Sequence, residues 1–250
     1  MQTAEQLDHL ERVVAALVAT TSDADPSTAV PTCGSWDIAK LLKHVGTVHR
    51  WSTAMVAELA PKRIDPRTLD LEIPGDVSDY PSWIAAGAQT MLTTLRAVDP
   101  DAPMFAWGAD QHARFWARRM LHETVVHHAD VQLAIGVEPS IPAEIALDTV
   151  DEFLDNLASA AGFNPEIANL AGDGVTIHLH ATDAPGEWMI ERTPDGFTYA
   201  HGHGKGDVAL RGPISDLALW MYARRSWTEA AFETFGDTAL LDHWIANSAL

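Results

Sequence analysis

The chain has 250 residues, of which 47% are hydrophobic and 20% charged, and this balance is typical of a globular protein with a substantial core. Its formal net charge of −19 repels phosphate backbones and anionic membrane surfaces, so we expect neither a nucleic-acid nor a membrane partner. No segment approaches the roughly 18 consecutive apolar residues of a membrane-spanning helix. The N-terminus reads as an amphipathic helix rather than a signal peptide, and the single cysteine, Cys33, cannot form an intramolecular disulfide, so we expect a cytoplasmic location.

The first two-thirds of the chain carry helical periodicity. Apolar residues recur at helical spacing from residue 3 to residue 20, and Ser35 is suited to cap a second helix that stops before Pro61. Clusters rich in proline and aspartate separate the later segments and predict loops. The expected helices span residues 3–20, 36–60, 81–97, 110–135 and 142–161.

The pattern changes near residue 168, where apolar and polar residues begin to alternate. Alternation with a period of two predicts strands, and Asp195-Gly196 predicts a hairpin turn. The expected strands span residues 175–182, 187–193, 197–202, 207–213 and 232–236, with helices over 214–225 and 238–247. We therefore predict an all-α helical bundle over residues 1–167, followed by a small α+β domain over residues 168–250.

The long helix predicted over residues 110–135 contains a candidate metal-binding pair. Glu123 and His127 are four residues apart, so both side chains project from one face of the helix. The pattern is not the HExxH motif of zinc proteases, because His122 and His127 are five residues apart. Pairs of this kind are also common on exposed helix faces, so the spacing alone leaves both interpretations open.

The second predicted helix offers two histidines as a third ligand. His44 shares a face with Leu41 and Val48, which suggests that it points to the core. His49 lies about 140° around the helix axis from His44, so we expect only one of them to face the bundle interior. Burying a histidine opposite the Glu/His pair without a common partner is costly, and a zinc ion would remove that cost because imidazole and carboxylate are good zinc ligands.

Other residues suited to chemistry are weaker candidates. His178 and His180 share one face of a predicted strand, and His201 and His203 lie in a glycine-rich segment, but exposed histidines of this kind usually have no ligand role. Neither a GxSxG nucleophile motif nor a glycine-rich phosphate loop occurs. Cys33 has no patterned base beside it, which favours a packing role in a loop over a nucleophilic one.

Five segments distributed over nearly the whole chain carry a family resemblance. The segments CGSWDIAKLLKHVGTVHRW and RRMLHETVVHHAD lie in the helical part, and TIHLHATDAPGEWMIE, GDVALRGPISDLALWMYAR and FGDTALLDHW lie in the α+β part. Together they resemble the actinobacterial mycothiol-dependent maleylpyruvate isomerase family, within the wider DinB/YfiT-like metalloprotein superfamily. The resemblance implies a DinB-like metal-binding bundle followed by a sterol-carrier-like α+β domain.

The resemblance also implies a set of functional residues. The tryptophan that begins the second helix is followed eight residues later by the first metal ligand, which selects His44 rather than His49. Glu123 and His127 complete the implied ligand set, with zinc or another divalent metal as the ion and mycothiol as the thiol cofactor. Arg224 of the second domain is implied as the catalytic and cofactor-binding arginine, because a guanidinium suits bidentate recognition of a carboxylate.

The implied activity is addition of an activated thiolate to an electrophilic small molecule. In an isomerase of maleylpyruvate type, addition to a cis double bond allows rotation, and elimination then releases the trans isomer. The alternatives are a mycothiol S-transferase acting on xenobiotic or biosynthetic electrophiles, and a non-catalytic metal- or ligand-binding protein. The expected partners are a small-molecule thiol and an electrophilic substrate, and the expected assembly is a monomer or a homodimer.

The sequence departs from the family pattern at three positions. His128 and Ala129 replace the arginine and tryptophan that usually follow the second ligand histidine, although Asp130 is retained and is suited to orient a ligand histidine. Ala223 stands where glycine often precedes the family's arginine. None of these changes removes a ligand, but all of them can alter the pocket.

Overall fold

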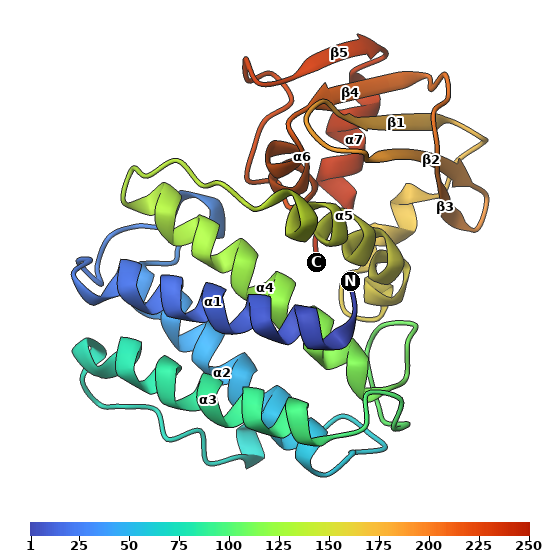
Figure 1. The fold of residues 1–250 in the computed structure, drawn as a ribbon. Coiled ribbons are helices and arrows are strands. Elements are labelled where there is room, and N and C mark those ends of the chain that lie inside the picture. The colour runs from blue at the N-terminus through green and yellow to red at the C-terminus, as the bar shows by residue number, and fades with distance from the viewer. The chain divides into compact units, whose positions relative to one another are not determined.

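The computed structural model describes residues 1–250 and divides the chain into two compact units, Met1–Ser140 and Ile141–Leu250. The first unit is helical, and the second combines a five-stranded sheet with helices (Figure 1). This confirms the predicted fold class of an all-α bundle followed by an α+β domain. No helix in either unit is both long and apolar enough to cross a membrane.

Four long helices make up the first unit, and each corresponds to a predicted segment. Apolar residues spaced three and four apart give each helix a buried face, as with Leu10 and Leu17, which are completely buried. The four helices lie alongside one another in Figure 1. They are α1 (Thr3–Ser22), α2 (Ile38–Ala57), α3 (Tyr80–Ala97) and α4 (Ala113–Ala134).

Helix α2 begins two residues after its predicted start. Asp37, rather than Ser35, caps this helix, because the Asp37 carboxylate accepts a hydrogen bond from the backbone N–H of Lys40 at 2.8 Å. The short 3₁₀ turn η1 (Pro31–Cys33) precedes the cap and packs against α4. The start of α2 is therefore fixed beside the helix that carries the candidate metal-binding pair.

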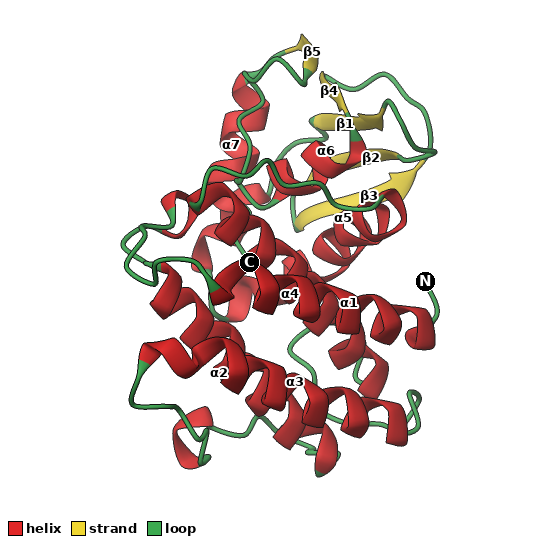
Figure 2. Cartoon of the chain, turned by 60° about the vertical axis from the view of Figure 1, so that its left-hand side comes forward, coloured by secondary structure: helices red, strands yellow, loops and turns green.

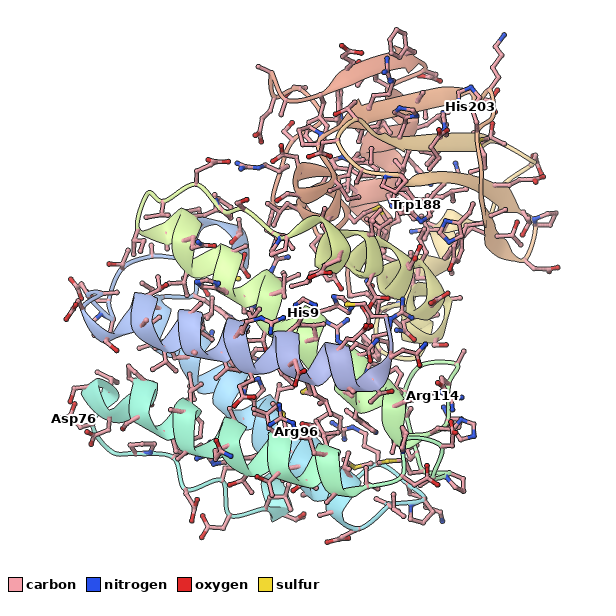
Figure 3. All side chains as sticks on the ribbon, viewed as in Figure 1. His9, Asp76, Arg96, Arg114, Trp188 and His203 are labelled. Carbon is pink, nitrogen blue, oxygen red and sulfur yellow. The ribbon has the colours of Figure 1, made fainter.

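Helices α1 and α3 are joined by apolar packing and by one exposed ionic cluster. Arg96 of α3, labelled in Figure 3, reaches Asp8 and Glu11 of α1 at 3.0 and 2.7 Å. Exposed ion pairs of this kind contribute little, typically less than about 1 kcal/mol. Burial of the apolar faces is therefore the larger stabilising contribution between these helices.

Helices α2 and α3 approach most closely where a glycine faces a tryptophan. The Trp83 ring of α3 lies directly over Gly46 of α2, so that any Cβ at residue 46 would overlap the ring. Arg50, one turn further along α2, stacks on the same ring at 4.3 Å and donates a hydrogen bond to the Trp83 carbonyl. This contact sets the distance between the two helices.

The second unit contains all the predicted strands within one or two residues of their expected bounds. One helix, α5 (Ala143–Leu157), precedes the sheet, and two short 3₁₀ segments follow it at Ala158–Gly162 and Pro165–Leu170. The strands are β1 (Thr176–Ala181), β2 (Glu187–Thr193), β3 (Gly196–His201), β4 (Val208–Gly212) and β5 (Glu233–Gly236). The remaining helices are α6 (Ile214–Met221) and α7 (Ala239–Asn247).

The strands form one mixed sheet in the order β3-β2-β1-β4-β5, in which only β1 and β4 are parallel. One face carries buried apolar residues such as Ile177, Leu179 and Leu210, and helices cover this face (Figure 2). Trp188 on the same face is completely buried, and its indole N–H donates to Asp151 of α5 at 2.7 Å. The opposite face carries the histidines of β1.

The domain boundary differs from the predicted one. The sequence places the boundary at residue 168, where the periodicity changes, whereas the structure divides after Ser140. Helix α5 belongs to the second unit because it packs on α6 and holds the buried tryptophan of β2 through Asp151. An α+β unit can begin with a helix, so a change of periodicity does not locate its first element.

We expect Gly46→Ala to destabilise the first unit by about 2 kcal/mol, because the added methyl group overlaps the rigid Trp83 ring and forces α2 and α3 apart. Gly87→Ala is the matched control. A Cβ there meets the guanidinium of Arg50, which is the end of a long side chain and can shift away from the Trp83 ring, and alanine favours helix, so the loss should be smaller, about 1 kcal/mol or less. Urea denaturation of the two variants measures both effects, and equal stability would contradict the proposed close contact.

Candidate metal centre

Helices α2 and α4 bring the three residues of the predicted ligand set together. His44 Nε2 lies 2.8 Å from Glu123 Oε1, and His127 Nε2 lies 3.3 Å from the same oxygen. One donor atom from each of the three side chains lies within 4.8 Å of the other two. Two imidazole nitrogens and one carboxylate oxygen are a set that can bind a divalent transition metal.

The helical spacing explains how α4 contributes two of these residues. Glu123 and His127 are one turn apart, so both project toward α2, where His44 meets them. The rings of His44 and His127 meet edge to face at 4.9 Å, and Trp36 lies beside both rings at 5.1 and 6.4 Å. Aromatic side chains therefore limit the freedom of both imidazoles.

A buried carboxylate orients the ring of His127. Asp130 is completely buried, and its Oδ2 lies 2.9 Å from His127 Nδ1. Thr32 and Cys33 of η1 donate to the two oxygens of Asp130 at 2.5 and 3.3 Å. With Nδ1 bound to Asp130, the other ring nitrogen, Nε2, is directed to Glu123 and His44.

The atoms of Cys33, His127 and Asp130 are also close enough to hold a metal. Solvent exposure distinguishes this group from the group of His44, Glu123 and His127. Asp130 is inaccessible to solvent, whereas the side chain of His44 is 34% exposed and that of Glu123 is 17% exposed. An ion and a small ligand can reach the Nε2 side of His127 more readily, so the Nδ1 side is better suited to support.

Glu123 is held as a carboxylate. Burial alone would raise the pKa of Glu123, but hydrogen bonds from His127 and His44 and the charge of Arg119 hold it well below its usual range. Arg119, one turn earlier on α4, is buried and donates to Glu123 Oε2 at 2.8 Å. The other oxygen, Oε1, faces the two histidines.

The groups around His127 favour its protonated form when no metal is bound. Burial alone would lower the pKa of His127, but hydrogen bonds with Asp130, Cys33 and Glu123 raise it well above its usual range. A metal bound at Nε2 would replace that proton, so metal binding and protonation compete at this ring.

The buried histidine of α2 is His49 and not His44, which differs from the prediction from helical periodicity. His49 is completely buried, with Nε2 at 2.9 Å from Thr124 Oγ1, whereas His44 lies at the partly exposed edge. Both histidines face α4, because that helix contacts a broad part of the α2 surface. The family resemblance, not the face argument, selected the histidine that meets Glu123.

Arg224 belongs to the second unit, where a helix-ending turn fixes its backbone. The Ala223 N–H donates to the Trp220 carbonyl and the Arg224 N–H donates to the Leu219 carbonyl, both at 2.8 Å. This is the Schellman pattern, which needs a left-handed residue after the helix, and Ala223 adopts it with φ of 60°. The guanidinium donates to the Tyr222 carbonyl at 2.7 Å. Glycine adopts this left-handed conformation without strain, which explains why glycine was expected at residue 223.

Two family models match the chain in tandem. One is described as the mycothiol maleylpyruvate isomerase N-terminal domain and matches residues 7–132, and the other is described as the MDMPI C-terminal domain and matches residues 144–243. The chain belongs to the mycothiol-dependent maleylpyruvate isomerase family. The family resemblance of the five sequence segments is thereby confirmed.

Two solved structures share the fold of this family member. One is the mycothiol-dependent maleylpyruvate isomerase, with 13% identity, a TM-score of 0.62, and coverage of 94% of this chain and 93% of that chain. The other is a histidine-to-alanine mutant of the same enzyme, with 12% identity, a TM-score of 0.61 and the same coverage. No curated protein matches the chain in sequence.

Two of the three departures from the family pattern, His128 and Ala129, directly follow His127 on α4 and are not part of the candidate ligand set. His128 Nε2 lies 3.1 Å from Thr20 Oγ1 of α1, and Ala129 is buried. The sequence did not predict the part that Thr32 or Arg119 takes in the site. The four-residue spacing of Arg119 and Glu123 could have indicated that pair, whereas no local pattern relates Thr32 to Asp130.

We expect His49 to make stability pH-dependent in the acid range. Burial, opposed by the charge of Glu123, lowers the pKa of His49 from 6.5 to about 4, and its Nδ1 has no hydrogen-bond partner. Between these values the unfolded chain binds a proton at residue 49 that the folded chain does not. The free energy of unfolding therefore falls with falling pH, by at most about 1.4 kcal/mol per pH unit from this residue.

His49→Gln removes this titration and retains a polar group for Thr124. Denaturant unfolding between about pH 7 and pH 4.5 should then show a shallower loss of stability in the variant than in the wild type. Parallel curves for the two proteins would contradict a neutral, buried His49.

Proposed function

We propose that this chain is a metal-dependent isomerase of maleylpyruvate type that uses mycothiol as its thiol. The observation that supports this proposal is the convergence of His44, Glu123 and His127 at a partly exposed edge between α2 and α4. Its family relatives include a mycothiol-dependent maleylpyruvate isomerase, which suggests both the thiol and the type of substrate.

The donor set fits zinc. Histidine nitrogen and carboxylate oxygen are ordinary zinc ligands, although other first-row ions accept the same set. Three protein ligands leave a position open, as in catalytic rather than structural zinc sites. When bound, the metal would supply a Lewis acid that lowers the pKa of a thiol held in the open position.

The surrounding residues would hold this ligand set in place. Asp130 fixes the orientation of His127, and Arg119 holds the Glu123 oxygen that faces away from the histidines. Groups that orient metal ligands in this way raise metal affinity and restrict the coordination geometry. In this proposal Asp130 and Arg119 are positioning residues rather than ligands.

Arg224 would bind a carboxylate of the substrate or of the thiol cofactor. A guanidinium forms paired hydrogen bonds with a carboxylate, which fixes both the position and the orientation of the bound molecule. Two backbone hydrogen bonds of the Schellman turn restrain the backbone of Arg224 independently of any ligand. We propose this role from the family resemblance and the chemistry of the side chain.

Metal analysis tests the ligand assignment. His44→Ala and Glu123→Ala should each contain one equivalent of zinc less than the wild-type protein, because two remaining ligands hold zinc weakly. His112→Ala is the control, since His112 is a half-exposed histidine at the start of α4 and lies outside the cluster. Wild-type zinc content in both ligand variants would refute the assignment.

Turnover of maleylpyruvate with mycothiol tests the activity and the role of Arg224. We expect Arg224→Ala to lower kcat/KM by roughly 10- to 100-fold while zinc content stays unchanged, because one charged hydrogen-bonding partner is lost. Arg67→Ala, which removes an exposed arginine paired with Asp65, should match the wild type.

The product of the same assay separates the competing activities. Release of the trans isomer with recovery of free mycothiol supports the isomerase. A stable thioether, with maleylpyruvate or with another electrophile, would instead identify an S-transferase. Metal binding without thiol-dependent turnover of any electrophile would identify a binding protein.

A further inference from the structure

A second cluster of metal-binding side chains lies in the second unit, on the sheet face that the helices leave uncovered. Its centre is Glu187 at the start of β2. His178 Nε2 and His203 Nδ1 lie 3.0 and 2.8 Å from Glu187 Oε2, and His180 Nδ1 lies 3.3 Å from Glu187 Oε1. One donor atom from each of the four residues lies within 4.8 Å of all the others.

The strand register explains three of the four positions. His178 and His180 alternate with buried apolar residues on β1, so both side chains project from the uncovered face. Glu187 is paired directly with His180 in the antiparallel register of β1 and β2, which places it on the same face.

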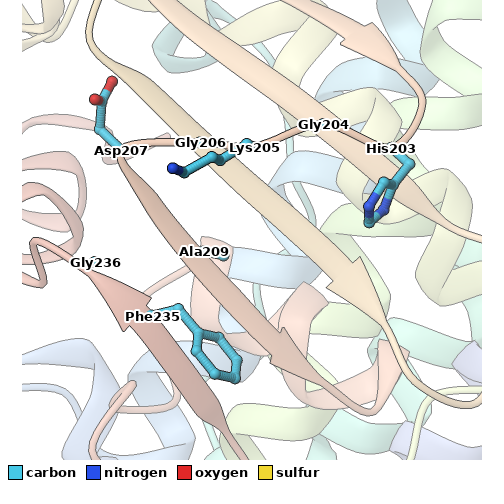
Figure 4. Close-up of a pocket in the computed structure, with 8 residues that line it drawn as sticks. All are labelled: His203, Gly204, Lys205, Gly206, Asp207, Ala209, Phe235 and Gly236. Atoms are coloured by element: carbon cyan, nitrogen blue, oxygen red, sulfur yellow. The ribbon is translucent and has the colours of Figure 1, made fainter.

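A glycine-rich loop supplies the fourth position. His203 lies in the loop between β3 and β4, which contains glycines at 202, 204 and 206, and Figure 4 shows the course of this loop from His203 to Asp207. A Cβ at residue 204 would lie 2.9 Å from Met189 Sδ, and one at residue 206 would lie 3.0 Å from the His178 backbone nitrogen. Only glycine allows the loop to lie this close to the sheet, and this approach places His203 beside Glu187.

We propose that His178, His180, Glu187 and His203 form a second site for a divalent transition metal of the zinc class. Four ligands placed tetrahedrally about 2.1 Å from a zinc ion are about 3.4 Å apart, which is close to the separations of 2.8 to 3.3 Å from the carboxylate oxygens. Three imidazoles and one carboxylate are an ordinary ligand set for a divalent cation of this class.

The three histidines of the site differ in solvent exposure. The side chain of His178 is 5% exposed, that of His180 is 25% exposed and that of His203 is 78% exposed. His203, labelled in Figure 3, lies in the loop after β3 and lines an open pocket of about 510 Å³ together with Lys205 and Phe235. An ion can therefore enter from the His203 side while the deeper ligands stay in place.

Four protein ligands make this a structural rather than a catalytic type of site. Such a metal joins the loop to the sheet, because one ligand comes from the loop and three come from adjacent strands. The site shares no residue with the cluster of His44, Glu123 and His127, so each can be removed without altering the other.

Zinc titration of full-length variants tests the proposal. Glu123→Ala serves as the background, because it removes the first cluster, and it should still bind one equivalent of zinc. Adding His203→Ala should weaken that binding at least roughly tenfold, since losing even an indirect partner of a metal ligand costs about that much. Glu187→Gln, added to the same Glu123→Ala background in place of His203→Ala, should weaken zinc binding similarly. Agreement between the two variants would show that the loss does not come from misfolding of one of them.

His201→Ala is the matched control. His201 is an exposed histidine two residues before His203, but it contacts Trp188 and Asp151 on the other face of the sheet. In the Glu123→Ala background, this variant should keep full zinc affinity. Zinc should also raise the Tm of the background protein, because it binds the folded state more tightly than the unfolded chain, and His203→Ala should make this rise smaller at the same zinc concentration.

Three results would overturn the proposal. They are the absence of zinc binding by the Glu123→Ala protein, an unchanged zinc affinity in both His203→Ala and Glu187→Gln, and an equal loss of affinity in His201→Ala. None of these results bears on the first cluster, which is tested by the zinc that Glu123→Ala loses relative to the wild type.

Discussion

The hydrogen bond between His127 and Asp130 is the interaction on which the candidate metal centre depends. An imidazole has two ring nitrogens, and occupying Nδ1 with a buried carboxylate directs Nε2 to the opposite side, where Glu123 and His44 lie. Asp130 is itself held by the η1 turn that precedes α2. The same carboxylate therefore ties the start of one ligand-bearing helix to the ligand face of the other.

Local patterns were sufficient to predict the elements and part of the site. Strand β1 and helix α4 were located within a few residues, because each buries a face whose period is visible in the sequence. The Glu123–His127 pair was recognised for the same reason, since one helical turn separates the two residues. His44 was chosen over His49 through the family resemblance, and the structure places it 2.8 Å from Glu123. Helical periodicity suggested that His44 points to the core, whereas His49 is the buried histidine of α2.

The features that the sequence did not reveal depend on contacts between distant segments. The sheet order, with β1 and β4 parallel, is not encoded in the alternation of any single strand. The place of His203 beside Glu187 depends on a loop lying against the sheet, and the role of Thr32 depends on an aspartate nearly one hundred residues later. The boundary after Ser140 follows from the packing of α5, which resembles a bundle helix in sequence.

The alanine before Arg224 has a consequence for recognition. A left-handed alanine costs about 1 kcal/mol or more relative to glycine, so the turn after α6 is less stable than it could be. A residue with a Cβ also samples fewer backbone conformations than glycine does. If Arg224 binds a carboxylate as proposed, its backbone has less conformational entropy to lose on binding, because folding has already restricted the residue before it.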